Sequence, residues 1–82
     1  MKLLKFYTTH CSQCKVQDKL LKDFNDVEVV PVDCNEREDM ADLYNIRNLP
    51  TLILVDNHKV IARFTGITQI EVIKNAIKNN NI

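Results

Sequence analysis

Two cysteines three positions apart, Cys11 and Cys14, are the residues of this sequence whose type and spacing best suit chemistry. They follow a compact apolar stretch, residues 3–7, and precede a segment with apolar residues at helical spacing. A cysteine at the start of a helix lies near unpaired backbone N–H groups and the positive end of the helix dipole. Both features favour the thiolate, which is the nucleophile in disulfide chemistry. The pair therefore indicates a redox centre in which Cys11 is the nucleophile, and Cys14, one turn later, can close a short disulfide with it.

The same spacing also occurs in zinc sites, but these usually need a second pair of ligands at a set distance. The remaining cysteine and histidines are Cys34, His10 and His58, and neither histidine falls in a ligand-pair pattern. A metal-binding module that uses Cys11, Cys14, Cys34 and His10 stays open, as does a structural role for the cysteines. The local pattern favours redox chemistry over both, and we expect no bound metal and no cofactor.

Length and composition limit the function further. The 82 residues predict one domain over residues 1–82, and the 45% apolar content is typical of a globular protein. Net charge is zero with acids and bases interspersed, which argues against nucleic-acid binding. No apolar run approaches the ~18 residues of a membrane span, and the first residues do not resemble a secretory signal. Together with the odd cysteine count, these features predict a monomer in a reducing cytoplasm.

The first half of the chain predicts a strand, a helix and a second strand. Residues 2–8 are apolar enough for a strand that is covered on both faces, as in a parallel sheet. Residues 12–24 predict a helix whose apolar stripe faces inward and comprises Val16, Leu20, Leu21 and Phe24. Residues 27–33 predict a strand at the edge of the sheet, because Pro31 cannot donate a hydrogen bond to a central ladder.

The second half predicts two helices around a hairpin. Asn35 and Glu38 fit a capping box for a short helix, which ends near Asn45 and buries Met40, Leu43 and Tyr44. Residues 51–55 and 60–65 predict antiparallel strands joined by a turn at Asp56 and Asn57. Thr68 and Glu71 fit a second capping box, for a helix with a buried stripe of Ile70, Ile73 and Ile77. The three asparagines 79–81 predict a frayed polar tail.

The predicted order is therefore β-α-β-α-β-β-α, an α/β fold with a four-stranded mixed sheet flanked by helices. The first β-α-β unit requires a right-handed crossover and a parallel strand pair. In such sheets ligands bind at the carboxyl ends of the parallel strands, and Cys11 falls there.

A second stretch, residues 44–51, brings Pro50 immediately before a buried strand. Base rates alone favour a trans Leu49–Pro50 bond, because only ~5–6% of such bonds are cis. Here the chain resembles the thioredoxin family, and the matching segments are residues 11–15, Tyr44, residues 46–47, residues 49–51 and Gly66. The resemblance implies a cis Pro50 that packs beside the disulfide, and a substrate peptide that pairs with the backbone just before it. It also implies a minimal thioredoxin fold of glutaredoxin size, without the family's usual first strand and helix.

The resemblance implies a function as well: reduction of protein disulfides through a mixed disulfide that Cys14 resolves. Leu49, Pro50 and His10 are then the expected substrate-binding residues. The expected partners are disulfide-containing proteins, with ribonucleotide reductase as one client, and a flavin-dependent thioredoxin reductase or a similar donor. A glutaredoxin-like, glutathione-dependent reductase is the alternative, although the expected Gly-Gly pattern is absent around Gly66. A redox-inactive adaptor that binds a partner through the rim around Pro50 also stays open.

The chain departs from the family pattern beside the cysteines. His10 stands where thioredoxins carry tryptophan, residues 12–13 replace their Gly-Pro, and Lys5 occupies the position of their buried acid. We expect Lys5 and Lys15 to tune the cysteine pair. The strand period of two turns Lys5 toward the helix that begins at the cysteines, where a cation would favour a Cys14 thiolate. A lysine can also extend to the rim of the sheet at little cost. For Cys34 we expect a buried hydrophobic role, with a third redox or regulatory thiol as the alternative.

Overall fold

The computed structural model describes residues 1–80, which form four strands and three helices in the predicted order. These elements are β1 (Lys2–Tyr7), α1 (Ser12–Leu20), β2 (Glu28–Asp33), α2 (Glu38–Leu43), β3 (Thr51–Asp56), β4 (Lys59–Thr65) and α3 (Ile70–Asn80). None of the helices in this part of the chain is long and apolar enough to cross a membrane.

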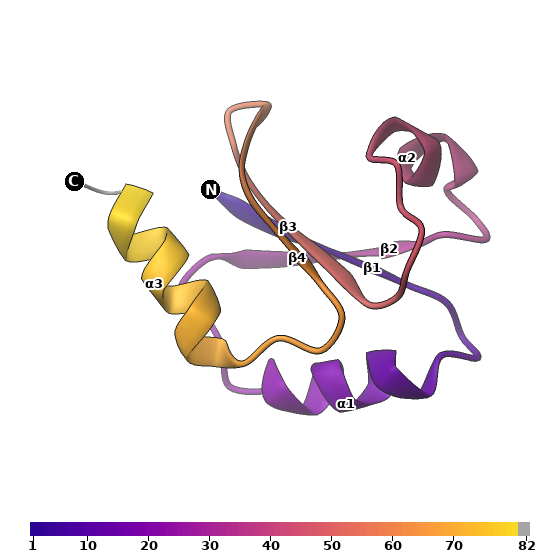
Figure 1. Cartoon of the computed structure of the whole chain (residues 1–82), viewed down its shortest axis with the longest axis horizontal. Coiled ribbons are helices and arrows are strands. Elements are labelled where there is room, and N and C mark those ends of the chain that lie inside the picture. The colour runs from indigo at the N-terminus through magenta and orange to yellow at the C-terminus, as the bar shows by residue number, and fades with distance from the viewer. Residues whose placement is uncertain (81–82) are drawn as a thin grey trace.

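The strands form one mixed sheet in the order β2-β1-β3-β4 (Figure 1). β1 runs parallel to β2 and antiparallel to β3, and β3 and β4 form the closing antiparallel hairpin. The edge position predicted for the second strand from Pro31 is confirmed, because β2 has β1 as its single neighbour. No strand lies on the outer side of β2, so the backbone N–H that Pro31 lacks is not needed for a ladder hydrogen bond on that side.

Helices cover both faces of the sheet, with α1 and α3 on one face and α2 on the other (Figure 1). Successive residues of β1 alternate between the faces: Leu3 packs with α3, and Leu4 and Phe6 pack on the side of α2. The core on the α1 and α3 side consists of Leu3, Leu21, Leu52, Leu54, Ile73 and Ile77. The core on the α2 side consists of Leu4, Phe6, Val32 and Ile53. β1 and β3 are apolar on both faces because each face is covered.

α1 is shorter than predicted and buries only part of the predicted stripe: Leu21 is buried and Phe24 packs against the same core, as expected. It ends at Leu20 instead of Phe24, and Val16, which was expected inside, is 45% exposed. The inward positions are Cys14 and Gln17, which continue to Leu21 in the turn after the helix. These three residues follow the spacing of one helix face, whereas Val16 lies about 100° away from Gln17.

α2 differs from the prediction at its start. Its N-cap is Arg37, which makes no side-chain capping bond, and the backbone N–H of Asn35 donates to Asp33 Oδ1 at 2.9 Å. The predicted Asn35 capping box is therefore wrong: the Asn35 N–H is bonded to Asp33 in a turn, and the helix begins two residues later than a cap at Asn35 requires. Leu43 is 74% exposed, so its predicted burial is wrong. Two residues do pack against the core as expected, Met40 and Tyr44.

One predicted helix stop is confirmed, and one predicted hairpin turn is displaced by a single residue. Asn45 has a positive φ of 53° directly after α2, which confirms it as the stop. The hairpin turn lies one residue later than predicted, at Asn57 (φ 49°) and His58 (φ 69°). Two positive φ angles are what a two-residue hairpin of the favoured hand requires.

The last helix buries its predicted isoleucines. Ile73 and Ile77 are buried and Ile70 packs against the same cluster. The predicted capping box is wrong, because the hydroxyl of Thr68 donates to the carbonyl of Gly66 at 3.0 Å. α3 extends through Asn80, so the frayed tail is also wrong there, and Asn81 lies outside the described residues.

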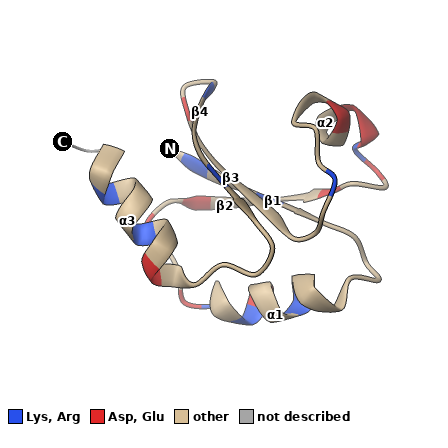
Figure 2. Cartoon of the chain, in the orientation of Figure 1, with Lys and Arg blue, Asp and Glu red and all other residues tan. Residues whose placement is uncertain are grey.

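Both α1 and α3 carry acidic and basic residues, whereas the charged residues of α2 are all acidic (Figure 2).

Candidate active site

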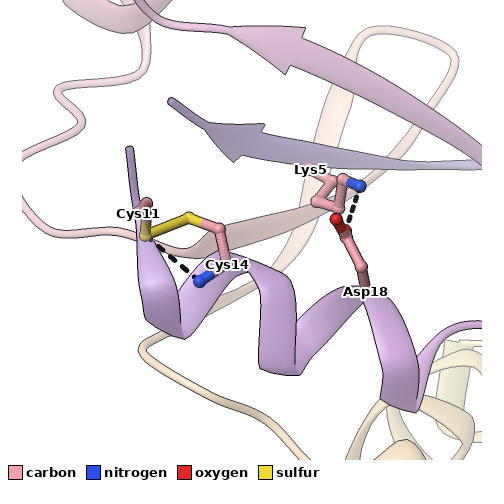
Figure 3. A network of polar contacts seen from close by, with 4 residues as sticks. All are labelled: Lys5, Cys11, Cys14 and Asp18. Carbon is pink, nitrogen blue, oxygen red and sulfur yellow. Dashed lines mark hydrogen bonds and ion pairs between the residues drawn. A yellow bond between two sulfur atoms is a disulfide. The ribbon is translucent and has the colours of Figure 1, made fainter. Parts of the chain in front are cut away.

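The cysteine pair lies at the head of α1, just beyond the carboxyl end of β1. Cys11 is the N-cap of the helix in an extended conformation, and it forms a disulfide with Cys14, whose Cα is 5.2 Å away (Figure 3). The backbone N–H of Cys14 donates to Cys11 Sγ at 3.1 Å. This N–H has no intrahelical partner, so the sulfur takes the place that a serine or aspartate oxygen usually takes at an N-cap.

The two sulfurs differ in exposure. Cys14 is 3% exposed and part of the core, whereas Cys11 is only half-buried and so more accessible. The first turn of α1 contains no acidic residue that would oppose a negative charge on Cys11. When the disulfide is reduced, the helix dipole and the Cys14 N–H both favour the Cys11 thiolate. The arrangement can therefore present one reactive thiolate to a partner and keep a second thiol beneath it.

Pro50 lies at the same edge of the sheet as the cysteines. Phe6 pairs with Thr51 in the β1–β3 register, so Pro50 follows where β1 leaves the sheet toward Cys11. The Leu49–Pro50 peptide bond is cis, as the family resemblance implied, and Pro50 is buried while Leu49 is half-buried. The Thr51 hydroxyl donates to the carbonyl of residue 48 at 2.6 Å, and the Gly66 N–H donates to the Pro50 carbonyl at 2.8 Å.

Lys5 points toward α1, as the strand period predicted, but its partner is not a cysteine. Its ammonium forms an ion pair with Asp18, one turn past Cys14 (Figure 3). The ammonium also lies 5.4 Å from the centroid of the Tyr7 ring. The side chain of Lys5 is 16% exposed and that of Asp18 is 50% exposed. The cation that the sequence placed near Cys14 is thus balanced by a carboxylate on the same helix as the cysteine.

The remaining candidates are more peripheral. His10 and Lys15 are exposed to solvent on either side of the disulfide in the sequence. Cys34 is half-buried, and its backbone N–H donates to the Tyr7 carbonyl at 2.9 Å, which places it near the end of β1. Burial raises the pKa of the Cys34 thiol, and the negative charge of Asp33 raises it further, against a hydrogen bond to Tyr7 that lowers it.

Metal ligands do not gather at this site. Across residues 1–80, no group of three or more histidine, cysteine, aspartate or glutamate side chains is placed to hold a metal ion. Of the four residues of the metal-binding alternative, Cys11 and Cys14 are joined in the disulfide, and Cys34 and His10 do not complete a ligand set with them.

Sequence reasoning missed Gln17. Its amide is fully buried and forms two hydrogen bonds with the backbone of Thr68. The signal was present in the spacing, because Gln17 lies three residues after Cys14 and so on the same helix face. The neighbouring apolar Val16 suggested a different inward face.

The four-stranded sheet, the disulfide at the head of its first crossover helix and the cis proline at the same edge define a thioredoxin-fold dithiol/disulfide protein. A thioredoxin family model matches residues 1–79. The chain belongs to the thioredoxin family.

Relatives and solved structures agree with this assignment. Thioredoxin C-2 of Corynebacterium nephridii is 33% identical over 69 residues, which are 78% of this chain and 64% of that protein. A protein disulfide-isomerase of Schizosaccharomyces pombe is 40% identical over 58 residues, which are 62% of this chain and 16% of that protein. The chain thus spans less than two thirds of the length of these relatives.

Among solved structures, thioredoxin 1 of Thermosipho africanus superposes with a TM-score of 0.79 at 25% identity, over 98% of this chain and 93% of that one. Reduced thioredoxin pre-protein of Schistosoma mansoni superposes with a TM-score of 0.83 at 29% identity, over 94% of this chain and 76% of that one.

Proposed function

We propose that this chain is a thiol–disulfide oxidoreductase that reduces disulfides in other proteins. The observation that carries the proposal is the unequal pair at the head of α1. Cys11 is accessible and accepts the Cys14 N–H at 3.1 Å, while Cys14 is 3% exposed. An accessible, helix-stabilised thiolate with a buried thiol next to it can react in two successive steps.

In the first step the Cys11 thiolate attacks one sulfur of the substrate disulfide. The substrate S–S bond breaks, the second substrate sulfur leaves as a thiolate and takes a proton from water, and a mixed disulfide forms at Cys11. In the second step Cys14 loses its proton to solvent and attacks Cys11 Sγ. The first substrate sulfur then leaves and is protonated. The substrate has gained two electrons and two protons, and this chain is left with the Cys11–Cys14 disulfide.

Leu49, Pro50 and His10 are the proposed substrate-binding residues. Support comes from the register of β1 and β3, which brings Pro50 to the edge where the chain turns toward Cys11. Leu49 is half-buried, and His10 precedes the nucleophile and is exposed. A substrate chain that pairs with the Leu49 backbone would present its disulfide to Cys11.

The finer assignments belong to the same proposal. Membership of the thioredoxin family supports disulfide-containing proteins as substrates, with ribonucleotide reductase as one client. It supports a flavin-dependent thioredoxin reductase as the electron donor. A monomer acting in the cytoplasm fits the mixed surface charge and the reducing surroundings that a dithiol needs.

The test is reduction of insulin with NADPH and a flavin-dependent thioredoxin reductase as the electron source. We expect turnover by the native chain and none by a variant with Cys11→Ser and Cys14→Ser together. A parallel reaction replaces the reductase by glutathione and glutathione reductase. Turnover only with glutathione would replace the proposal by the glutaredoxin-like alternative. No insulin reduction with dithiothreitol or either donor would overturn it and favour a redox-inactive adaptor.

A further inference from the structure

Gln17 is a buried polar side chain in a helix that is otherwise mostly exposed. It is 0% exposed, and the other buried residue of α1 is Cys14, three positions earlier on the same face. A side-chain amide carries two donor hydrogens and an acceptor oxygen, and burying them without partners is unfavourable. The amide must therefore be matched by groups on the neighbouring segment.

Its partner is the backbone of a single residue, Thr68, 51 positions away. Gln17 Nε2 donates to the Thr68 carbonyl at 3.0 Å, and Gln17 Oε1 accepts the Thr68 N–H at 2.7 Å. The two bonds resemble the pair that opposed residues exchange in an antiparallel ladder. Because both the N–H and the C=O of Thr68 are held, the loop is fixed in rotation as well as in distance from α1.

The same loop holds the proline segment. Thr68 lies between β4 and α3, and its hydroxyl donates to the Gly66 carbonyl at 3.0 Å. The Gly66 N–H donates to the Pro50 carbonyl at 2.8 Å, which extends the β3–β4 ladder by one bond. Gly66 has a φ of +85°, a conformation that glycine adopts without strain. A continuous path of hydrogen bonds therefore runs from the cysteine helix to Pro50.

We propose that Gln17 is a positioning residue that holds the loop 66–69 against α1 and thereby sets the position of Pro50 relative to the two cysteines. The inference rests on the proposed function, because it requires a protein substrate that binds along Leu49 and Pro50. A small disulfide can reach Cys11 without contacting that segment. Gln17 should therefore matter for protein substrates and not for small ones.

The first experiment compares Gln17→Met with the native chain. Methionine keeps the length of glutamine and tolerates burial, but it lacks the amide that pairs with Thr68. The pre-reduced proteins are mixed with insulin or with hydroxyethyl disulfide, and the second-order rate constants are measured. We expect a loss of about tenfold with insulin, equivalent to ~1.4 kcal/mol, and less than about twofold with hydroxyethyl disulfide.

The outcomes separate the two proposals. Equal losses with both substrates, or an unchanged rate with insulin, would overturn the positioning role while the oxidoreductase function stands. A native chain that reduces neither substrate would overturn the proposed function and this inference with it.

A second variant, Gln17→Glu, tests the hydrogen bonds themselves. A protonated carboxyl can replace the amide, since its O–H donates to the Thr68 carbonyl and its other oxygen accepts the Thr68 N–H. An ionised carboxylate has no O–H to donate, so one of its oxygens would face the oxygen of the Thr68 carbonyl and the two acceptors would repel each other. Burial raises the pKa of such a carboxyl above its usual value of about 4.3, so mild acid should restore the pairing.

The readout is the ratio of the insulin rate of Gln17→Glu to that of the native chain, measured from about pH 8 to about pH 5. We expect a deficit of about tenfold at the alkaline end that shrinks to within about twofold at the acid end. Gln69→Glu is the matched control, because Gln69 is exposed next to Thr68 and carries the same substitution. Its ratio should not change with pH. A flat ratio for Gln17→Glu would overturn the inference, even if Gln17→Met fails to fold.

Discussion

Lys5 on β1 and Asp18 on α1 form an ion pair that connects the first strand to the cysteine helix. Asp18 lies four residues after Cys14, on the same side of α1 (Figure 3). The Lys5 ammonium also lies 5.4 Å from the Tyr7 ring centroid, so it contacts a carboxylate and an aromatic ring one helical turn beyond Cys14. We therefore expect any effect of the Lys5 charge on Cys14 to depend on Asp18 as well.

Replacing Lys5 by methionine should raise the pKa of Cys14. The substitution leaves the Asp18 carboxylate without its counter-ion one turn from the sulfur, and a nearby negative charge disfavours a thiolate. We expect a rise of less than about one unit, because partly exposed ion pairs contribute ~0.2–1 kcal/mol and one unit corresponds to ~1.4 kcal/mol. At a pH where Cys14 ionises, the reduction potential should become more negative. Titration of isotope-labelled cysteine by NMR measures the change.

Asp18→Asn is the opposite change and should lower the pKa of Cys14, because Lys5 keeps its charge and loses its partner. The double variant, Lys5→Met with Asp18→Asn, should return close to the native value. A Cys14 titration that is identical in all four proteins would show that the pair only ties β1 to α1.

The roles of the two cysteines predict different trapping behaviour. Cys14→Ser should accumulate a mixed disulfide with insulin, because the accessible Cys11 still attacks and no buried thiol releases the product. Cys11→Ser should accumulate little, because Cys14 is 3% exposed. Non-reducing electrophoresis followed by mass spectrometry identifies the linked species. Trapping by Cys11→Ser alone would reverse the assignment of nucleophile and resolver.

Much of the fold followed from the sequence because its strongest signals are local. Pro31 placed the second strand at an edge, and the alternation along β1 placed Lys5 beneath α1. The cysteine spacing gave the disulfide, whereas the cis Leu49–Pro50 bond followed from the family resemblance and not from base rates.

The errors arose where tertiary partners decide between local options. Gln17 is buried instead of Val16, because the backbone of Thr68, 51 residues away, satisfies its amide. Nothing within the helix sequence reveals that partner. Asn35 is not a cap because its N–H already bonds Asp33, and this competition between a turn and a capping box depends on where β2 ends.

Arg63 is predicted to stabilise the end of α2. Its guanidinium, on β4, donates to the carbonyls of Tyr44 at 2.5 Å and Asn45 at 2.9 Å. These carbonyls follow the end of α2 and have no intrahelical N–H partner. Arg63→Ala should lower the free energy of unfolding by about 1 kcal/mol, measured by urea denaturation. Arg63→Lys should recover only part of the loss, because an ammonium cannot bind two carbonyls as a planar fork does. Lys74→Ala, which removes an exposed charge on α3, is the control and should change stability by less than about 0.5 kcal/mol.

Cys34 can be tested as a thiol in a background that lacks the other two cysteines, Cys11→Ser with Cys14→Ser. Burial raises its pKa and the charge of Asp33 raises it further, so little thiolate is present at neutral pH. The pH profile of its alkylation by iodoacetamide should therefore have a midpoint above about 8.5, the usual value for cysteine. Such a thiol is a poor nucleophile, and we expect Cys34→Ser alone to leave insulin reduction unchanged.

Asp33→Asn isolates the electrostatic part of this effect. Asparagine keeps the oxygen that accepts the Asn35 N–H, but it removes the negative charge beside Cys34. The pKa of Cys34 should fall, and alkylation near neutral pH should become about threefold faster because the thiolate fraction rises. Asp42→Asn changes the net charge equally from an exposed position on α2 and should leave the rate as it was. Equal acceleration in both variants would mean that overall charge, and not the neighbouring carboxylate, controls the thiol.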